Sequence, residues 1–187
     1  QAQWGEAVLR LFRRGGWIRY LSRDGYWFRG WEQSRSIREW RLLAELRAAG
    51  LAVPQPLAAL CWRRGWMYRA ALITALIPGA RTAGDVLAAG EPAPERAGLE
   101  VGRKLAAFHA AGVYHADLNL NNILRDAAGE WWLIDLDRGR RYRRLPRMLR
   151  RMNLRRLHRS LTAARINARN RSEFWIGLCR GYREAEA

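Results

Sequence analysis

The spacing of apolar residues in the first part of the chain predicts three strands. The side chains of residues 6–12 are expected to alternate between the two faces of a strand, with Val8 and Arg10 on the same face. Two further apolar runs, 57–62 and 66–74, are separated by a short turn that contains glycine, which is typical of a hairpin. A small antiparallel sheet is therefore expected in this part of the sequence.

Apolar residues recur at intervals typical of helices at several places further along the chain. A helix is expected from Ser36, as its N-cap, to just before Gly50, because apolar residues recur there at intervals of three and four. The same spacing predicts a longer helix over 95–111 and a basic amphipathic helix after Pro146. Residues 171–185 complete the pattern as a closing helix.

The order of these elements indicates an α+β protein in two lobes. The segment 74–79 contains a proline and a glycine and reads as a crossing between the lobes. We expect a small β-rich lobe over residues 1–76 and a mainly helical lobe over 77–187, with a short hairpin formed by 122–124 and 131–135.

Polar residues gather in the loop that precedes this hairpin. Asp117 and Asn122 lie in the loop, and Asp135 lies at the exit of the second strand. Carboxylate and amide oxygens suit Mg²⁺, which commonly takes one or two carboxylates together with substrate phosphates. Asn122 and Asp135 are therefore candidate metal ligands, and Asp117 is a candidate base for an acceptor hydroxyl.

The loop sequence HADLNLNNIL resembles the catalytic loop of protein-kinase-like enzymes, H-x-D-L-x-x-x-N, and IDLD stands where those enzymes have D-F-G. The resemblance makes His115 part of the catalytic loop, as a group that holds the loop by hydrogen bonds rather than as a proton carrier. The alternative is that Asp117 and the asparagines only cap turns, as such side chains often do.

Glu39 shares a face of the first helix with three leucines, and an acid rarely faces inward without a partner. In the kinase plan this glutamate meets a strand lysine that holds nucleotide phosphates. Here the strand offers Arg10, which suits carboxylate and phosphate, and Val8 beside it is a further candidate for contact with ATP. The alternative is a partly exposed Glu39 paired with Arg35 or Arg38.

Several separate sequence segments narrow the resemblance to one family of kinase-like enzymes, including IPGAR, HADLNLNNIL and WLIDLDRGR. They are similar to the lipopolysaccharide kinases of the Kdo/WaaP family over residues 7–161. The resemblance implies Mg²⁺- and ATP-dependent phosphorylation of the 4-hydroxyl of a Kdo sugar on lipid A. Asp117 would be the base, Asn122 and Asp135 the magnesium ligands, and Arg10 with Glu39 the phosphate-orienting pair.

The chain departs from the family at one place. Members carry a glycine-rich hairpin before the strand of Arg10, whereas nine residues precede Arg10 in this sequence. The β-rich lobe is therefore expected to lack its first strands, which puts nucleotide affinity in question.

The formal net charge of +17 indicates an anionic partner. No window approaches the length of a membrane-spanning segment, so we expect a cytoplasmic protein. The basic segment 138–161 predicts contact with the anionic face of the inner membrane or with the acceptor itself; an ordinary packed helix with a solvated basic face is the alternative.

Three other functions remain open from the sequence. The 34 basic residues and 10 tryptophans would also suit a single-strand nucleic-acid binder, but the tryptophans fall in expected strands and helices, where a core position is usual. Asn119 stands where protein kinases have lysine, which leaves a heptose kinase or an aminoglycoside-type phosphotransferase possible. A pseudokinase without turnover is the third. The oligomeric state cannot be read from the sequence.

Overall fold

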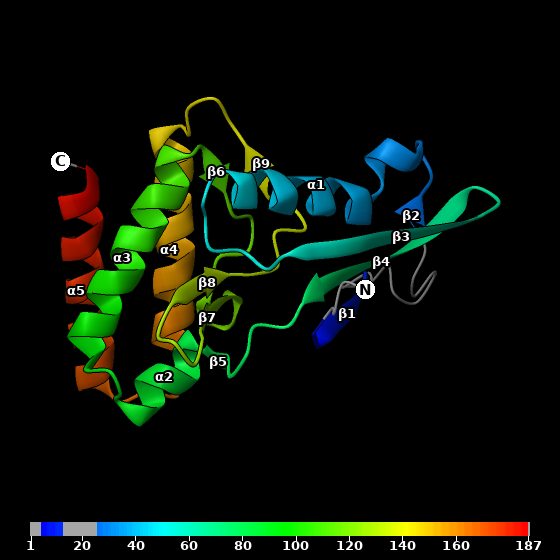
Figure 1. The fold of residues 1–187 in the computed structure, drawn as a ribbon. Helices are drawn as coiled ribbons and strands as arrows, with labels where there is room; N and C mark the ends of the chain where they lie inside the picture. The colour runs from blue at the N-terminus through cyan, green and yellow to red at the C-terminus, as the bar shows by residue number, and fades with distance from the viewer. Residues whose placement is uncertain (1–4, 13–25, 187) are drawn as a thin grey trace.

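The computed structural model describes residues 5–12 and 26–186. One end of the molecule is built on a four-stranded antiparallel sheet (Figure 1). Its central strand, β4 (Met67–Ala75), pairs with β3 (Pro56–Arg64) on one side and with β1 (Ala7–Leu11) and β2 (Tyr26–Trp27) on the other. The three predicted strands are confirmed.

Helix α1 (Arg35–Ala48) lies over β3 and β4 (Figure 1). The predicted N-cap at Ser36 is wrong, because the helix begins at Arg35 and Ser34 occupies the N-cap position, two residues earlier. Ser36 is instead buried in the first turn, where its hydroxyl donates to the carbonyl oxygen of Leu60 at 2.9 Å. The predicted end is confirmed, since Gly50 adopts a positive φ of 76° just past the helix, a conformation that glycine allows at low cost.

The other end of the molecule is mainly helical, with α3 (Pro94–Ala110), α4 (Arg147–Ala163) and α5 (Ala168–Glu186) side by side (Figure 1). These helices match the predictions over 95–111, after Pro146 and over 171–185. Helix α2 (Ala83–Ala89) was not predicted. Its signal is a capping box, in which Thr82 and Asp85 satisfy each other's backbone N–H groups.

Short elements connect the two ends of the molecule. Strands β5 (Arg81–Thr82), β7 (Ile123–Arg125) and β8 (Trp131–Leu133) form a three-stranded sheet, and β6 (Val113–Tyr114) pairs with β9 (Arg140–Arg141). The hairpin expected from the sequence is thus present as β7 and β8. The fold is α+β, as predicted, with a β-rich and a helical lobe, and the boundary at residues 76 and 77 stays a prediction.

The sequence predicted core positions for the tryptophans, but the structure places only some of them in the core. Trp131 is buried, but Trp27, Trp31, Trp62 and Trp66 are exposed. Trp27 and Trp62 lie on the edge strands β2 and β3. Trp31 lies in a short 3-10 helix, η2 (Trp31–Gln33), and Trp66 in the turn between β3 and β4. Strand periodicity alone does not tell which face is covered.

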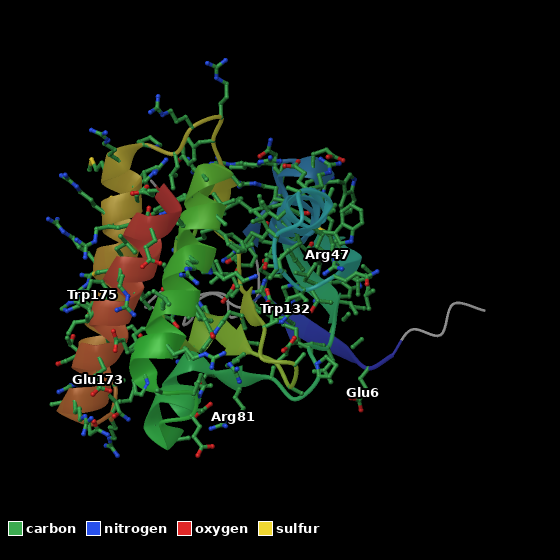
Figure 2. The ribbon with its side chains drawn as sticks, turned by 60° about the vertical axis from the view of Figure 1, so that its left-hand side comes forward. Glu6, Arg47, Arg81, Trp132, Glu173 and Trp175 are labelled. Atoms are coloured by element: carbon green, nitrogen blue, oxygen red, sulfur yellow. The ribbon has the colours of Figure 1, made fainter. Side chains whose placement is uncertain are left out.

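In the described ranges, no helix combines the length and the apolar character needed to cross a bilayer. Figure 2 instead shows many nitrogen-tipped side chains along the outer surface of the C-terminal helices.

Candidate active site

The catalytic-loop segment is shaped by its own asparagines. Between β6 and β7 the chain makes a single turn of 3-10 helix, η3 (Leu120–Asn122). The side-chain oxygen of Asn119 accepts from the backbone N–H groups of Asn121 (2.9 Å) and Asn122 (3.2 Å). The turn-capping interpretation is therefore correct for Asn119, whose side chain is used in holding the loop.

Asn122 is buried and joins the loop to the segment that follows β8. Its side-chain nitrogen donates to the carbonyl oxygen of Asp117 at 2.9 Å. Its backbone carbonyl accepts from the backbone N–H of Ile134 at 3.0 Å, which places the loop directly beside Asp135. The side-chain oxygen of Asn122 takes part in no hydrogen bond among the described residues.

His115 holds the same loop from inside. The residue is 2% exposed, and its Nδ1 accepts from the backbone N–H of Asp117 at 3.2 Å. The proton therefore lies on Nε2, which donates to the carbonyl oxygen of Ile134 at 2.9 Å. Burial lowers the pKa of His115, so the ring is neutral and both nitrogens are occupied in bonds to the loop.

Asp135 adopts a positive φ of 59°, which no other non-glycine residue in the described part of the chain does. Such backbone conformations are costly and concentrate at functional sites. The carboxylate is bonded by Arg10, and the same guanidinium also bonds Glu39 from α1. Arg10 thus joins the β-rich lobe to the segment that follows β8.

Glu39 is 2% exposed, so the alternative of a partly exposed residue paired with Arg35 or Arg38 does not hold. Burial raises the pKa of Glu39 to about 7, although the positive charge of Arg10 acts in the opposite direction. Arg10 is only partly buried, and its charge faces the pocket described next.

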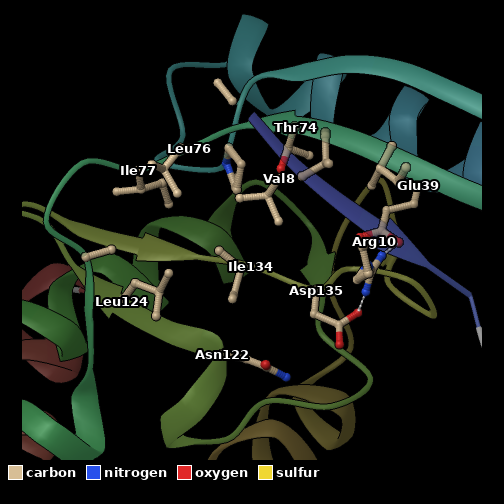
Figure 3. A pocket seen from close by; sticks show the side chains of 15 residues that line it. Val8, Arg10, Glu39, Thr74, Leu76, Ile77, Asn122, Leu124, Ile134 and Asp135 are labelled. Carbon is tan, nitrogen blue, oxygen red and sulfur yellow. Dashed lines mark hydrogen bonds and ion pairs between the residues drawn. The ribbon is translucent and has the colours of Figure 1, made fainter. Parts of the chain in front are cut away.

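A cavity of about 230 Å³ brings most of the predicted site residues together (Figure 3). Val8, Arg10 and Glu39 line it from the β-rich lobe, and Asn122 and Asp135 line it from the other side. The remaining walls are largely apolar and come from both lobes: Leu43, Pro54, Leu72, Thr74, Ala75, Leu76, Ile77, Ala80, Leu124 and Ile134. Sequence reasoning did not assign this apolar wall, because its members are ordinary core residue types.

The donor set on the cavity floor fits a divalent cation shared with phosphate. Asn122 has a side-chain oxygen to offer, and one oxygen of Asp135 is bonded by Arg10. Within the described residues no group of three histidine, cysteine, aspartate or glutamate side chains is arranged to hold a metal. Mg²⁺ that also binds substrate phosphates nevertheless needs only one or two protein carboxylates, and protein kinases hold it with one aspartate and one asparagine.

A second ion pair joins the lobes near this site. Arg35, in the first turn of α1, donates through Nε to Asp137 at 2.6 Å, two residues after Asp135. Its guanidinium also lies over the ring of Tyr26. The IDLD segment is therefore bonded to the β-rich lobe at both of its aspartates.

Asp117 does not line the cavity, and its side chain is 58% exposed. Its Oδ1 accepts from Arg156 of α4 at 2.6 Å. Sequence reasoning did not find this arginine, because it lies 39 residues further along the chain among many similar residues. Asn122 links Asp117 to the cavity through the hydrogen bond to the Asp117 carbonyl.

These features define a protein-kinase-like fold with a cavity that is lined from both lobes. The model of the lipopolysaccharide kinase (Kdo/WaaP) family matches residues 1–180, and the chain belongs to this family.

Curated relatives narrow the comparison. The chain is 47% identical over 168 residues to a 3-deoxy-D-manno-octulosonic acid kinase of Xanthomonas campestris pv. campestris (strain B100), covering 89% of this chain and 66% of the relative. It is also 47% identical over 166 residues to the enzyme of the same name from Stenotrophomonas maltophilia (strain R551-3), covering 88% of this chain and 65% of that relative. The chain thus spans about two thirds of the length of these relatives.

A solved structure with a similar fold is that of WaaP in complex with acyl carrier protein. It matches with a TM-score of 0.58 and 19% identity, covering 94% of this chain and 91% of the other. At this identity the match supports the fold alone.

Proposed function

We propose that this protein is a Mg²⁺- and ATP-dependent kinase that phosphorylates the 4-hydroxyl of Kdo on lipid A during assembly of the lipopolysaccharide core. The single observation that carries the proposal is the cavity where Arg10, Glu39, Asn122 and Asp135 meet, beside the loop of Asp117. The relatives named 3-deoxy-D-manno-octulosonic acid kinase support the choice of acceptor.

In this proposal the cavity receives ATP. The apolar wall and Val8 contact the adenine ring of ATP. Arg10 binds the phosphates, and Glu39 orients the guanidinium of Arg10. Mg²⁺, when bound, neutralises charge on the phosphates. Asn122 and Asp135 supply oxygen ligands for it from the cavity floor.

Asp117 acts on the acceptor. Its carboxylate accepts the proton of the Kdo hydroxyl while that oxygen forms a bond to the γ-phosphorus and the bond to the β-phosphate oxygen breaks, which releases ADP. His115 holds the loop in register through its bonds to the backbone of Asp117 and Ile134 and takes no proton.

The role of Asp117 is tested with Asp117→Asn, which keeps the size of the side chain and removes the base. Turnover of Kdo-lipid A is expected to fall roughly 10²- to 10⁴-fold with an unchanged fold. Asp126→Asn, in the turn between β7 and β8, is the control and should keep its activity. Full turnover by Asp117→Asn would contradict the assignment, and phosphorylation of heptose or an aminoglycoside with inert Kdo-lipid A would reassign the acceptor.

The metal site is tested with Asp135→Asn. Asparagine tolerates the positive φ at this position better than alanine does, so the variant removes charge without adding strain. Titration calorimetry should show ATP affinity in the presence of Mg²⁺ falling at least about 10-fold, or about 1.4 kcal/mol, with little change without Mg²⁺. Equal loss in both conditions would exclude Asp135 as a metal ligand.

We further propose that the protein works at the cytoplasmic face of the inner membrane. The loop before α4 and its first turns carry exposed Arg143, Arg144, Arg147, Met148 and Arg151, here called the basic patch. Arginines near an anionic leaflet contribute to binding, and an exposed methionine adds an apolar contact. The lipid-linked acceptor lies at such a surface.

A further inference from the structure

Helix α4 contacts the catalytic loop through one stripe of polar side chains. Asn153 accepts from the backbone N–H of His115 at 3.2 Å and donates to the carbonyl oxygen of the same residue at 2.6 Å. Ser160 accepts from the backbone N–H of Leu120 at 3.1 Å. Arg156 lies between them on the helix, and spacings of three and four residues put all three on one face.

This polar stripe is anchored in the buried core of the helical lobe. Asn153 is 1% exposed, and its side-chain oxygen also lies 3.2 Å from Nε2 of His109, whose Nδ1 lies 2.7 Å from the hydroxyl of Tyr182. Leu157 beside it is fully buried. The position of Arg156 relative to the loop is therefore fixed by the core on which α4 packs.

Arg156 meets the carboxylate proposed as the base. Its Nη1 lies 2.6 Å from Oδ1 of Asp117, with side chains that are 44% and 58% exposed. Oδ2 of Asp117 has no hydrogen bond among the described residues. The pair thus holds one carboxylate oxygen and leaves the other toward solvent, where an acceptor hydroxyl would lie.

The loop has no positive charge of its own. Residues 113–124 contain neither lysine nor arginine, and Arg10 is already bonded to Glu39 and Asp135. A carboxylate that takes a proton must stand in one orientation relative to the hydroxyl, and a small misplacement is costly to the rate. Arg156 is the cation that the structure places on Asp117.

We propose that Arg156 is a positioning residue, which fixes the carboxylate of Asp117 so that Oδ2 faces the acceptor hydroxyl. The proposal rests on the proposed function, because it assigns a role through Asp117. The competing explanation is a surface ion pair without consequence, since exposed pairs contribute little to stability. The two explanations differ in their effect on turnover.

The test compares Arg156→Ala, Arg156→Lys and the control Arg155→Ala. Arg155 is exposed on the same helix and has no hydrogen bond or ion pair within the described part of the chain. We expect Arg156→Ala to lower kcat by about 10- to 10²-fold with an unchanged KM for ATP, Arg156→Lys to recover part of the loss, and Arg155→Ala to resemble the unaltered protein. Unchanged kcat in Arg156→Ala, or an equal loss in Arg155→Ala, would overturn the proposal.

A double-mutant cycle with Asp117→Asn separates this inference from the proposed function. If Arg156 acts through Asp117, the second substitution should cost little further rate in the Asp117→Asn protein, because coupled residues are not additive. If the fold-losses in kcat of the two single variants multiply in the double variant, Arg156 does not act through Asp117 and the proposal is overturned. If Asp117→Asn itself has full turnover, the proposed function fails first; if only Arg156→Ala has full turnover, the inference alone fails.

Added guanidinium ion gives a second measurement. It should restore part of the activity of Arg156→Ala by occupying the vacated position, and it should leave Asp117→Asn unrestored. Equal response of the two variants would contradict a specific role for the arginine.

Discussion

At the scale of single residues, Glu39 shows how a buried acid is tolerated. Its carboxylate is bonded by Arg10, yet burial still raises its pKa to about 7. An ionised acid in such surroundings needs its partner, and removal of the partner leaves an uncompensated charge. The same guanidinium bonds Asp135, so the charge balance of the cavity depends on one side chain.

The raised pKa predicts a pH dependence of stability. Because the folded protein holds this proton more tightly than the unfolded chain, whose carboxyl has a pKa near 4.5, the contribution of Glu39 is full below pH 4.5 and is lost as the pH rises through about 7. Glu39→Gln has no such titration. Between pH 5 and pH 8 the variant should gain stability relative to the unaltered protein, on the order of 2 kcal/mol.

Urea unfolding of both proteins at the two pH values measures this difference. Comparison of the two proteins cancels the titration of all other groups that they share. A difference in unfolding free energy that stays the same at both pH values would contradict the raised pKa.

At the scale of elements, α3 and α5 pack with their backbones in contact. Gly98 and Gly102 on α3 face Phe174 and Leu178 of α5, and Gly177 and Gly181 on α5 face Glu95 and Leu99 of α3. A side chain at any of these four glycines would collide with the backbone of the other helix. Small residues four apart therefore set how closely the two helices approach.

This packing predicts that Gly102→Ala is destabilising although alanine favours helix. The added methyl group would overlap the carbonyl of Leu178, so the helices must separate, at a cost of about 1 to 3 kcal/mol. Gly84→Ala in α2 is the matched control, since its neighbours lie at ordinary contact distances. It should be neutral or stabilise by up to about 1 kcal/mol.

Chemical denaturation of the two variants measures the effect. Equal stability of Gly102→Ala and the unaltered protein would show that the helices are not held at this distance.

At the scale of the whole molecule, the charge is unevenly placed. The basic patch lies at the amino end of α4, whereas Arg81 lies at the opposite end of the helical lobe (Figures 1 and 2). A net charge of +17 attracts anionic surfaces in general. The proposed membrane contact further requires that the face with the basic patch binds an anionic membrane better than the other faces do.

Replacement of Arg143, Arg144 and Arg147 by glutamine tests this contact. At about 1 kcal/mol for each arginine near an anionic surface, binding to vesicles that contain phosphatidylserine should fall about 10²-fold. The control replaces exposed Arg81, Arg96 and Arg169 in the same way and removes the same charge. Similar losses in the two triple variants, measured by sedimentation with vesicles, would show that net charge alone is responsible.

Much of the fold follows from local patterns in the sequence. The strand of Arg10, the helix of Glu39 and the hairpin before Asp135 were predicted because alternation and helical spacing are local properties. The cap at Ser36 was wrong because the helix begins where Arg35 finds tertiary partners in Tyr26 and Asp137. Helix α2 was missed because its seven residues are too short for periodicity to be seen.

The sequence by itself singled out the candidate site residues, because the spacing of Asp117 and Asn122 within one loop is a local feature. The tertiary structure decided which partners these residues have. Arg10 meets Asp135 across 125 positions, and Arg156 meets Asp117 across 39. Such pairs depend on how the lobes and helices pack, and one arginine among 33 cannot be singled out until packing places it beside a carboxylate.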